Sequence, residues 1–275
     1  MPSFTLARKV DPRYKTNRIM LIMTITLFVA RGLFTNDWSG SLVFSAGFFL
    51  TWALAREIDP LHEKSAFVAA FMYLSMVLWI VDVKLGVVFW TVLLLRGITG
   101  ITGKQTTALD LLGLVGLGIY LILGQGNGIY GLIFTAAMVI GYRRSAKDAV
   151  FTVFILVGMV VSVWGFSRYS IALPGEALLL DSFRVVYLLV GLVSGTFFGW
   201  MLQKDQGMQD DQGKGIETKY VFFSYLFYLG MYGVLIAGTD LDQGTLSLLF
   251  AVILGVAFYR GWLMISVCVS RGRKV

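Results

Sequence analysis

The sequence predicts an all-α, polytopic integral membrane protein with about ten transmembrane helices and both termini in the cytoplasm. Three observations lead to this fold class: an apolar composition, ten separate apolar segments, and an uneven distribution of basic residues. Of the 275 residues, 57% are hydrophobic and 14% are charged, whereas soluble domains carry about 25% charged residues. A soluble core of this size cannot bury so much apolar surface, but a lipid bilayer accepts it.

Ten apolar segments separated by polar or glycine-rich connections are the predicted transmembrane helices. Several are shorter than the roughly 20 residues that cross a bilayer core. We expect flanking polar residues to extend these helices, because their long side chains can reach the head groups. The segment 85–95 is the weakest helix, and a re-entrant segment there would invert every later orientation. In chain order, the predicted helices span residues 19–34, 42–55, 66–81, 85–95, 107–123, 129–142, 149–166, 183–202, 220–237 and 245–269.

The domain organisation follows from these segments. A basic cytoplasmic segment, residues 1–18, precedes a single transmembrane domain, residues 19–269, and a basic cytoplasmic tail covers residues 270–275. The apolar run after residue 18 leads into further spans, so we expect a retained first helix rather than a cleaved signal peptide. The cytoplasmic loops are predicted near residues 56–65, 96–106, 143–148 and 203–219.

The basic residues test this helix count independently. With a cytoplasmic N-terminus and alternating helices, 18 of the 23 lysines and arginines lie on the cytoplasmic side. Arg260 lies within the last helix, and the four outer basic residues are Arg31, Lys84, Arg168 and Arg184. Cytoplasmic loops of membrane proteins carry such an excess of basic residues. The net charge of +7 is therefore attributed to topology, and no nucleic-acid partner is predicted.

A weak internal repeat suggests how the helices are arranged. Residues 6–12 (LARKVDP) precede the first predicted helix, and residues 54–60 (LAREIDP) close the second. The repeat favours five helical hairpins around a central pore, although a chance similarity between two basic segments is an alternative. Two inverted repeats of five helices each also fit ten spans in a chain of this length.

The rare residue types exclude several kinds of site. Cys268 is the only cysteine and His62 the only histidine in the sequence. An intrachain disulfide, a tetrahedral zinc site built from histidine and cysteine, and a bis-histidine haem site are therefore excluded. Sequence motifs of hydrolases and of zinc peptidases are also missing. We expect neither a cofactor nor a metal, and the sequence does not identify an enzyme.

The densest group of ionisable residues follows the second predicted helix, where Arg56, Glu57 and Asp59 lie close together. The loop after the fourth helix should reach the same membrane face. We expect a cytoplasmic pocket for an anion, because arginine and lysine side chains and backbone N–H groups bind phosphate or carboxylate. The second loop contributes Arg96, Thr99 and Lys104, the N–H groups of Gly97, Gly100 and Gly103, and Thr107 as the cap of the fifth helix. The alternative is two solvated loops whose basic side chains contact lipid head groups.

Two ionisable residues lie inside predicted spans, where charges are costly and suggest function. Asp110 and Arg260 are both expected in the cytoplasmic half, where their opposite charges could pair. Such a pair could serve a gate or a substrate, or it could only hold helices together. Gly191, Gly195 and Gly199 form a small-residue stripe on one helix, which we expect to be an internal packing seam, with dimerisation as the alternative.

Three functions fit these features. The first is a membrane transporter or channel for a small solute, with an anion as one candidate, which predicts a cavity that reaches the membrane midplane. The second is a non-catalytic subunit or scaffold of a membrane protein assembly, which predicts a flat face of small residues. The third is a membrane enzyme that acts on a lipid-linked phosphate, which predicts a shallow pocket open sideways to lipid. The expected partners are membrane lipids, a small-molecule or ionic solute, and other membrane subunits.

Overall fold

The computed structural model describes residues 4–6, 10–78, 82–100, 104, 106–145, 148–169, 182–205, 213, 215 and 217–272. Within these residues the chain forms ten helices and no strand. The helices are α1 (Lys15–Thr35), α2 (Trp38–Ile58), α3 (Glu63–Val77), α4 (Leu85–Thr99), α5 (Ala108–Gln125), α6 (Ile129–Arg144), α7 (Ala149–Arg168), α9 (Ser182–Leu202), α10 (Thr218–Gly238) and α11 (Gln243–Gly272).

Each predicted apolar segment forms a helix, so the all-α class is confirmed. Most helices extend past the apolar run into polar flanks, as expected for side chains that reach an interface. The second helix, predicted over 42–55, covers Trp38–Ile58, and the fourth, predicted over 85–95, reaches Thr99. The third helix, predicted over 66–81, covers Glu63–Val77, and residues 79–81 lie outside the described residues.

Seven of the helices in the described part of the chain are long and apolar enough to cross a membrane: α1, α2, α5, α7, α9, α10 and α11. The other three, α3, α4 and α6, have 15 to 16 residues. Large apolar side chains point outward along the peripheral helices; Val160 and Val163 of α7, for example, are 68% and 70% exposed. These features are consistent with an integral multi-pass membrane protein, because lipid can cover apolar side chains that water would not.

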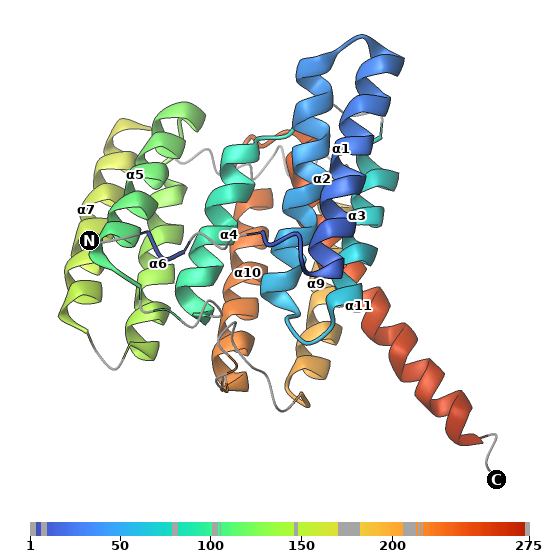
Figure 1. The fold of residues 1–275 in the computed structure, drawn as a ribbon. Coiled ribbons are helices and arrows are strands. Elements are labelled where there is room, and N and C mark those ends of the chain that lie inside the picture. The colour runs from blue at the N-terminus through green and yellow to red at the C-terminus, as the bar shows by residue number, and fades with distance from the viewer. Residues whose placement is uncertain are drawn as a thin grey trace.

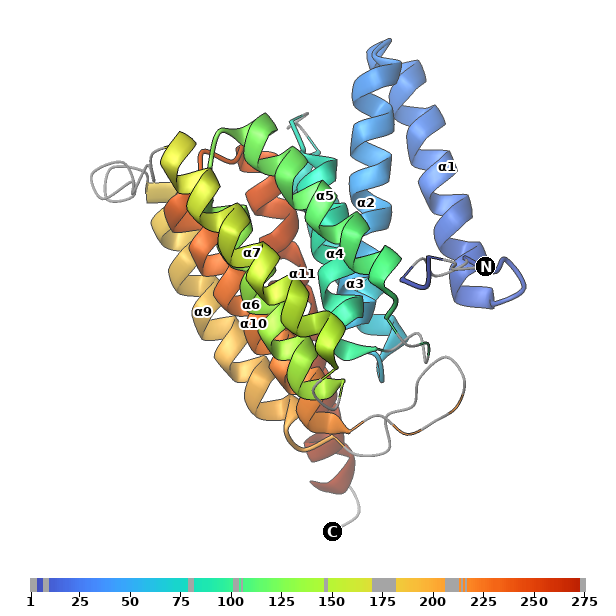
Figure 2. The same ribbon diagram turned by 90° about the vertical axis from the view of Figure 1, so that its left-hand side faces the viewer.

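The helices form a bundle in which α4 and α10 take the central positions (Figure 1). Helices α5, α6 and α7 pack on one side of this centre, and α1, α2 and α3 lie on the other side. Helix α11 packs between α3 and α9. Figure 2 shows α1 and α2 as a hairpin at one edge of the bundle, with α7 and α9 at the opposite edge.

The glycine stripe of α9 lies against α10, as predicted for an internal seam. A methyl group added at Gly191 would lie 2.6 Å from the ring of Tyr232, and one at Gly195 would lie 2.7 Å from the hydroxyl of Tyr225. At Gly199 the nearest atom, again of Tyr225, is 3.1 Å away. The stripe therefore lets the backbone of α9 approach the tyrosines of α10 within one chain.

Substituting Gly195 with valine is expected to lower the stability of the protein by about 1–3 kcal/mol, because the new side chain overlaps Tyr225 and Leu229. Thermal unfolding of purified protein in detergent measures this effect. Gly230→Val in α10 is the control, since its added Cβ meets nothing within 4 Å. Equal melting temperatures for the two variants would contradict the packing role of the stripe.

Candidate functional site

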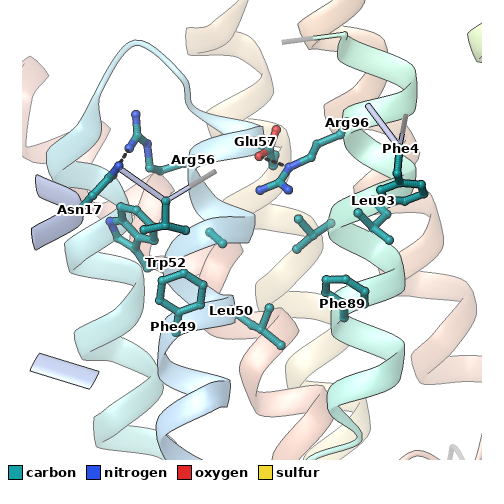
Figure 3. Close-up of a pocket in the computed structure, with 13 residues that line it drawn as sticks. Phe4, Asn17, Phe49, Leu50, Trp52, Arg56, Glu57, Phe89, Leu93 and Arg96 are labelled. Carbon is teal, nitrogen blue, oxygen red and sulfur yellow. Dashed lines mark hydrogen bonds and ion pairs between the residues drawn. The ribbon is translucent and has the colours of Figure 1, made fainter. Parts of the chain in front are cut away.

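A groove of about 180 Å³ lies between α2 and α4 (Figure 3). Arg56, Glu57 and Arg96 line its polar end, and apolar and aromatic side chains such as Trp52 and Phe89 line the rest. Asn17 of α1 and two residues before α1, Phe4 and Val10, complete its wall. We call this feature the α2/α4 groove. Its charged side chains thus lie at one end and its apolar side chains along the rest.

The ends of two helices place the charged side chains. Arg56 and Glu57 lie in the last turn of α2, which ends at Ile58 just before the Asp59-Pro60 dipeptide. Proline lacks an N–H group and restricts the preceding residue, so the helix cannot continue through it. Arg96 lies in the last turn of α4, where a cation also interacts favourably with the helix dipole. From Phe49 to Arg56 the groove follows α2 for two turns, or roughly 10 Å.

Arg96 and Glu57 form the ion pair at the polar end. The Nε of Arg96 donates to Oε1 of Glu57 at 2.7 Å, and Glu57 is only 1% exposed. The second oxygen, Oε2, is buried and has no hydrogen-bond partner among the described residues. A buried carboxylate needs its counter-charge, since an unpaired charge in the interior costs several kcal/mol. Arg96 is therefore required both for the fold at this end and for the charge of the groove.

Arg56 lies nearer the rim of the groove and connects three helices. Its Nη1 donates to Oδ1 of Asn17 in α1 at 3.2 Å, and its Nη2 lies 3.3 Å from Oε1 of Glu63 in α3. The guanidinium also lies over the ring of Trp52, 5.3 Å from its centre. The side chain of Arg56 is 14% exposed and that of Glu63 is 50% exposed, so a ligand head group could reach Arg56 from the rim.

Asp110 holds the start of the chain on α5. Thr5 donates to it through both its backbone N–H and its hydroxyl group, at 2.6 and 2.7 Å, and the N–H of Leu6 donates at 3.3 Å. Thr107 forms the predicted cap of α5, in a capping box with the same carboxylate. The expected pairing of Asp110 with Arg260 is wrong, because the N-terminal segment satisfies Asp110 instead.

Arg260 lies in a separate centre with two carboxylates. Its Nη2 donates to Oδ1 of Asp59 at 2.9 Å and also to Asp205, which follows α9, and its Nη1 reaches Asp205 at 3.0 Å. His62 is 3.2 Å from Asp59. Asp59, His62 and Asp205 lie close enough together to bind a cation, but the guanidinium of Arg260 already provides the positive charge there. Asp59 thus pairs with Arg260, and it does not line the α2/α4 groove with Arg56, Glu57 and Arg96.

The glycine-rich segment after α4 does not offer its N–H groups as predicted. Gly97 lies inside α4, and the N–H of Gly100 donates to the carbonyl of Arg96 at 2.9 Å. Gly100 takes a left-handed conformation (φ 60°) and closes the helix against the side chain of Arg144. Gly103 lies outside the described residues. The expectation of a phosphate-binding backbone is therefore wrong at Gly97 and Gly100, where the backbone ends a helix.

Two further residues of the predicted site, Thr99 and Lys104, lie outside the groove. Thr99 is buried and donates to the carbonyl of Leu95 within α4, while Lys104 is exposed. Neither lines the groove as the described residues define it. The structure thus brings together Arg56, Glu57 and Arg96 from the predicted set.

Sequence reasoning missed three contributors: Asn17, Trp52 and the segment around Phe4. The repeated LAR motif draws attention to the segment around Leu6. The motif does not indicate, however, that this segment contacts Asp110, which is more than 100 residues away in the sequence.

Comparisons with protein-family models, with curated proteins and with solved structures found no match to this chain. The proposals that follow therefore depend on the chain's own residues and on their geometry.

Proposed function

We propose that this protein is a ten-span membrane protein of the cell membrane that binds an amphiphile with an anionic head group, such as a lipid-linked phosphate, in the α2/α4 groove. One observation carries the proposal: the groove joins a cluster of two guanidinium groups and one carboxylate to an apolar lining two helical turns long. The charged groups thus lie at one end only, where Arg96 pairs with the buried Glu57 and Arg56 with Glu63, which is half exposed at the rim.

The proposed topology places the charged end of the groove at the cytoplasmic face. Seven helices meet the length expected of a span, and polar flanks would complete α3, α4 and α6. The contact of Asp110 with Thr5 joins the segment around Thr5 to the start of α5, and the contacts of Arg260 with Asp59 and Asp205 join α11 to the ends of α2 and α9. With the basic loops in the cytoplasm, these contacts and the groove's charged end belong to the inner leaflet.

The chemistry of the groove favours a lipid phosphate over a fully soluble anion. Arginine binds phosphate with directed, charge-assisted hydrogen bonds. Below the arginines, Trp52 and Phe49 offer apolar surface, and Phe89 is 44% exposed at the side of the bundle. A hydrocarbon chain could therefore leave the groove sideways into the membrane.

The axis of the bundle gives less support to conduction of a solute. Trp90 of α4 and Tyr228 and Tyr232 of α10 are fully buried there, and all three donate to backbone carbonyls. These side chains fill the space between the central helices in this conformation. A transporter of small anions and a scaffold subunit are the alternatives that a lipid titration distinguishes from the proposed function.

Replacing Arg56 with glutamine is expected to weaken binding of dioleoyl phosphatidic acid about tenfold, the effect of losing roughly 1.4 kcal/mol of charge-assisted bonding. The measurement is the thermal stability of the purified protein in detergent, titrated with phosphatidic acid or with dioleoyl phosphatidylcholine. Lys64→Gln is the matched control, because Lys64 is an exposed cation in the first turn of α3, next to Glu63.

Each outcome separates the three functions. Stabilisation of wild type and Lys64→Gln by phosphatidic acid, reduced in Arg56→Gln, supports the proposal. An equal response in all three proteins would refute a head-group site at Arg56. Stabilisation by free glycerol phosphate without any lipid dependence would favour a transporter of small anions. No response to any of these ligands would favour a subunit or scaffold, which co-purification can then test.

A further inference from the structure

The start of the chain is built into the wall of the groove. Phe4, Thr5 and Leu6, which we call the N-terminal strap, cross the ends of α4 and α5 near Arg96. Thr5 is 9% exposed and Leu6 is 1% exposed, so the strap is packed against the helices and does not extend into solvent.

Asp110 provides most of these contacts. Its Oδ1 accepts the N–H groups of Thr5 and Leu6, and its Oδ2 accepts the hydroxyl of Thr5. Oδ2 also accepts the N–H and hydroxyl groups of Thr107. All five bonds are donated to the carboxylate, so an amide side chain in its place would turn an N–H group toward other donors.

Arg96 connects the strap to the groove. Its Nη1 donates to the carbonyl of Leu6 at 3.2 Å while its Nε pairs with Glu57. The guanidinium is thus held from two sides, by a buried carboxylate and by the strap. Phe4 contributes a second connection, because its ring lines the groove and lies against Gly113 of α5, 3.2 Å from the position of an added methyl group.

We propose that the N-terminal strap is part of the ligand site and that Asp110 is a positioning residue, which holds the strap so that Arg96 and Phe4 face the ligand. This inference rests on the proposed binding of an anionic amphiphile in the α2/α4 groove. A guanidinium that is already oriented loses less freedom when it binds a phosphate, and the affinity is higher for that reason. Release of the strap would remove one anchor of Arg96 and one apolar wall.

Hydrogen exchange on the purified full chain, without any ligand, tests the strap itself. We expect the amides of Thr5 and Leu6 to exchange at least tenfold faster in Asp110→Asn than in wild type. Thr107→Ala is the matched control: it removes the cap of α5 but leaves the bonds from Thr5 and Leu6 to Asp110. Unchanged exchange in Asp110→Asn would overturn the assignment of Asp110.

Titration with dioleoyl phosphatidic acid tests the connection to the site. We expect affinity to fall about tenfold in Asp110→Asn and severalfold in Thr5→Ala, and to stay near wild type in Thr107→Ala. Unchanged or higher affinity in Asp110→Asn would mean that the strap does not position Arg96, or that it blocks the groove, and would overturn the proposal.

Hydrogen exchange and the phosphatidic acid titration together distinguish a failure of the proposed function from a failure of the strap proposal. If wild type does not bind phosphatidic acid, the proposed function fails and the ligand role of the strap fails with it, whereas hydrogen exchange still decides whether Asp110 holds the strap. If wild type binds and only Asp110→Asn and Thr5→Ala lose affinity, both proposals are supported.

Discussion

Replacing Arg260 with methionine is expected to destabilise the protein by about 3–5 kcal/mol, the cost of leaving buried charges without their partner. Arg260 is 7% exposed and Asp59 is fully buried, and Asp205 contacts the same guanidinium. Without the guanidinium, two carboxylates from the ends of α2 and α9 lie within 4.8 Å of each other with no counter-charge from Arg260. Thermal unfolding monitored by tryptophan fluorescence in detergent measures the loss.

Two further variants identify the cause of this loss. Arg168→Met removes an exposed arginine and should change stability by less than about 0.5 kcal/mol. Adding Asp59→Asn and Asp205→Asn to Arg260→Met removes the unpaired charges and should restore most of the stability. If the triple variant is no more stable than Arg260→Met, the loss comes from packing and the ion-pair account is wrong.

Substituting Gly255 with alanine is expected to cost about 3 kcal/mol, at the upper end for overpacking. The added Cβ would lie 2.6 Å from the backbone nitrogen of Ala69 and nearer still to its Cα. Because these are backbone atoms of α3, no side chain can rotate away, and the two helices must separate. The melting temperature of the purified protein and its yield after detergent extraction measure the effect.

Gly116→Ala in α5 is the matched control for this prediction. Nothing lies within 4 Å of the Cβ that it would add, so it should be neutral or stabilise the helix by up to about 1 kcal/mol. A similar loss in both variants would show that alanine is tolerated poorly at any glycine of this bundle. The close approach of α3 and α11 would then not explain the result.

Most of the fold could be predicted because each helix is encoded by a continuous apolar run. Proline after Asp59, threonine at the start of α5 and the basic residues in the connections mark the helix ends locally. Most predicted helices lacked their polar flanks, as for Trp38–Ile58, since hydropathy does not show where a helix continues into an interface. The number of spans and the orientation remain predictions.

The candidate site was predicted only in part. Arg56, Glu57 and Arg96 were expected together, because the ends of α2 and α4 should reach one face, and they do line one groove. The partners of Asp59, Asp110 and Arg260 were not predictable, because they are distant in the sequence. Asp59 and Arg260 are 201 residues apart, and Asp110 and Thr5 are 105 residues apart. The sequence predicted similar depths in the membrane for Asp110 and Arg260. Equal depth does not show that their helices are neighbours, so it could not predict a contact.

The amino-acid sequence by itself determined that this chain is helical and where along it the apolar helices lie, because helix formation and transfer of apolar side chains are local properties. Only the tertiary structure decided that Asp110 binds the N-terminal strap, that Arg260 joins Asp59 to Asp205, and that Arg96 lies between Glu57 and Leu6. Those choices depend on which helix faces pack together, and a buried charge pairs with whichever group that packing brings within hydrogen-bonding distance.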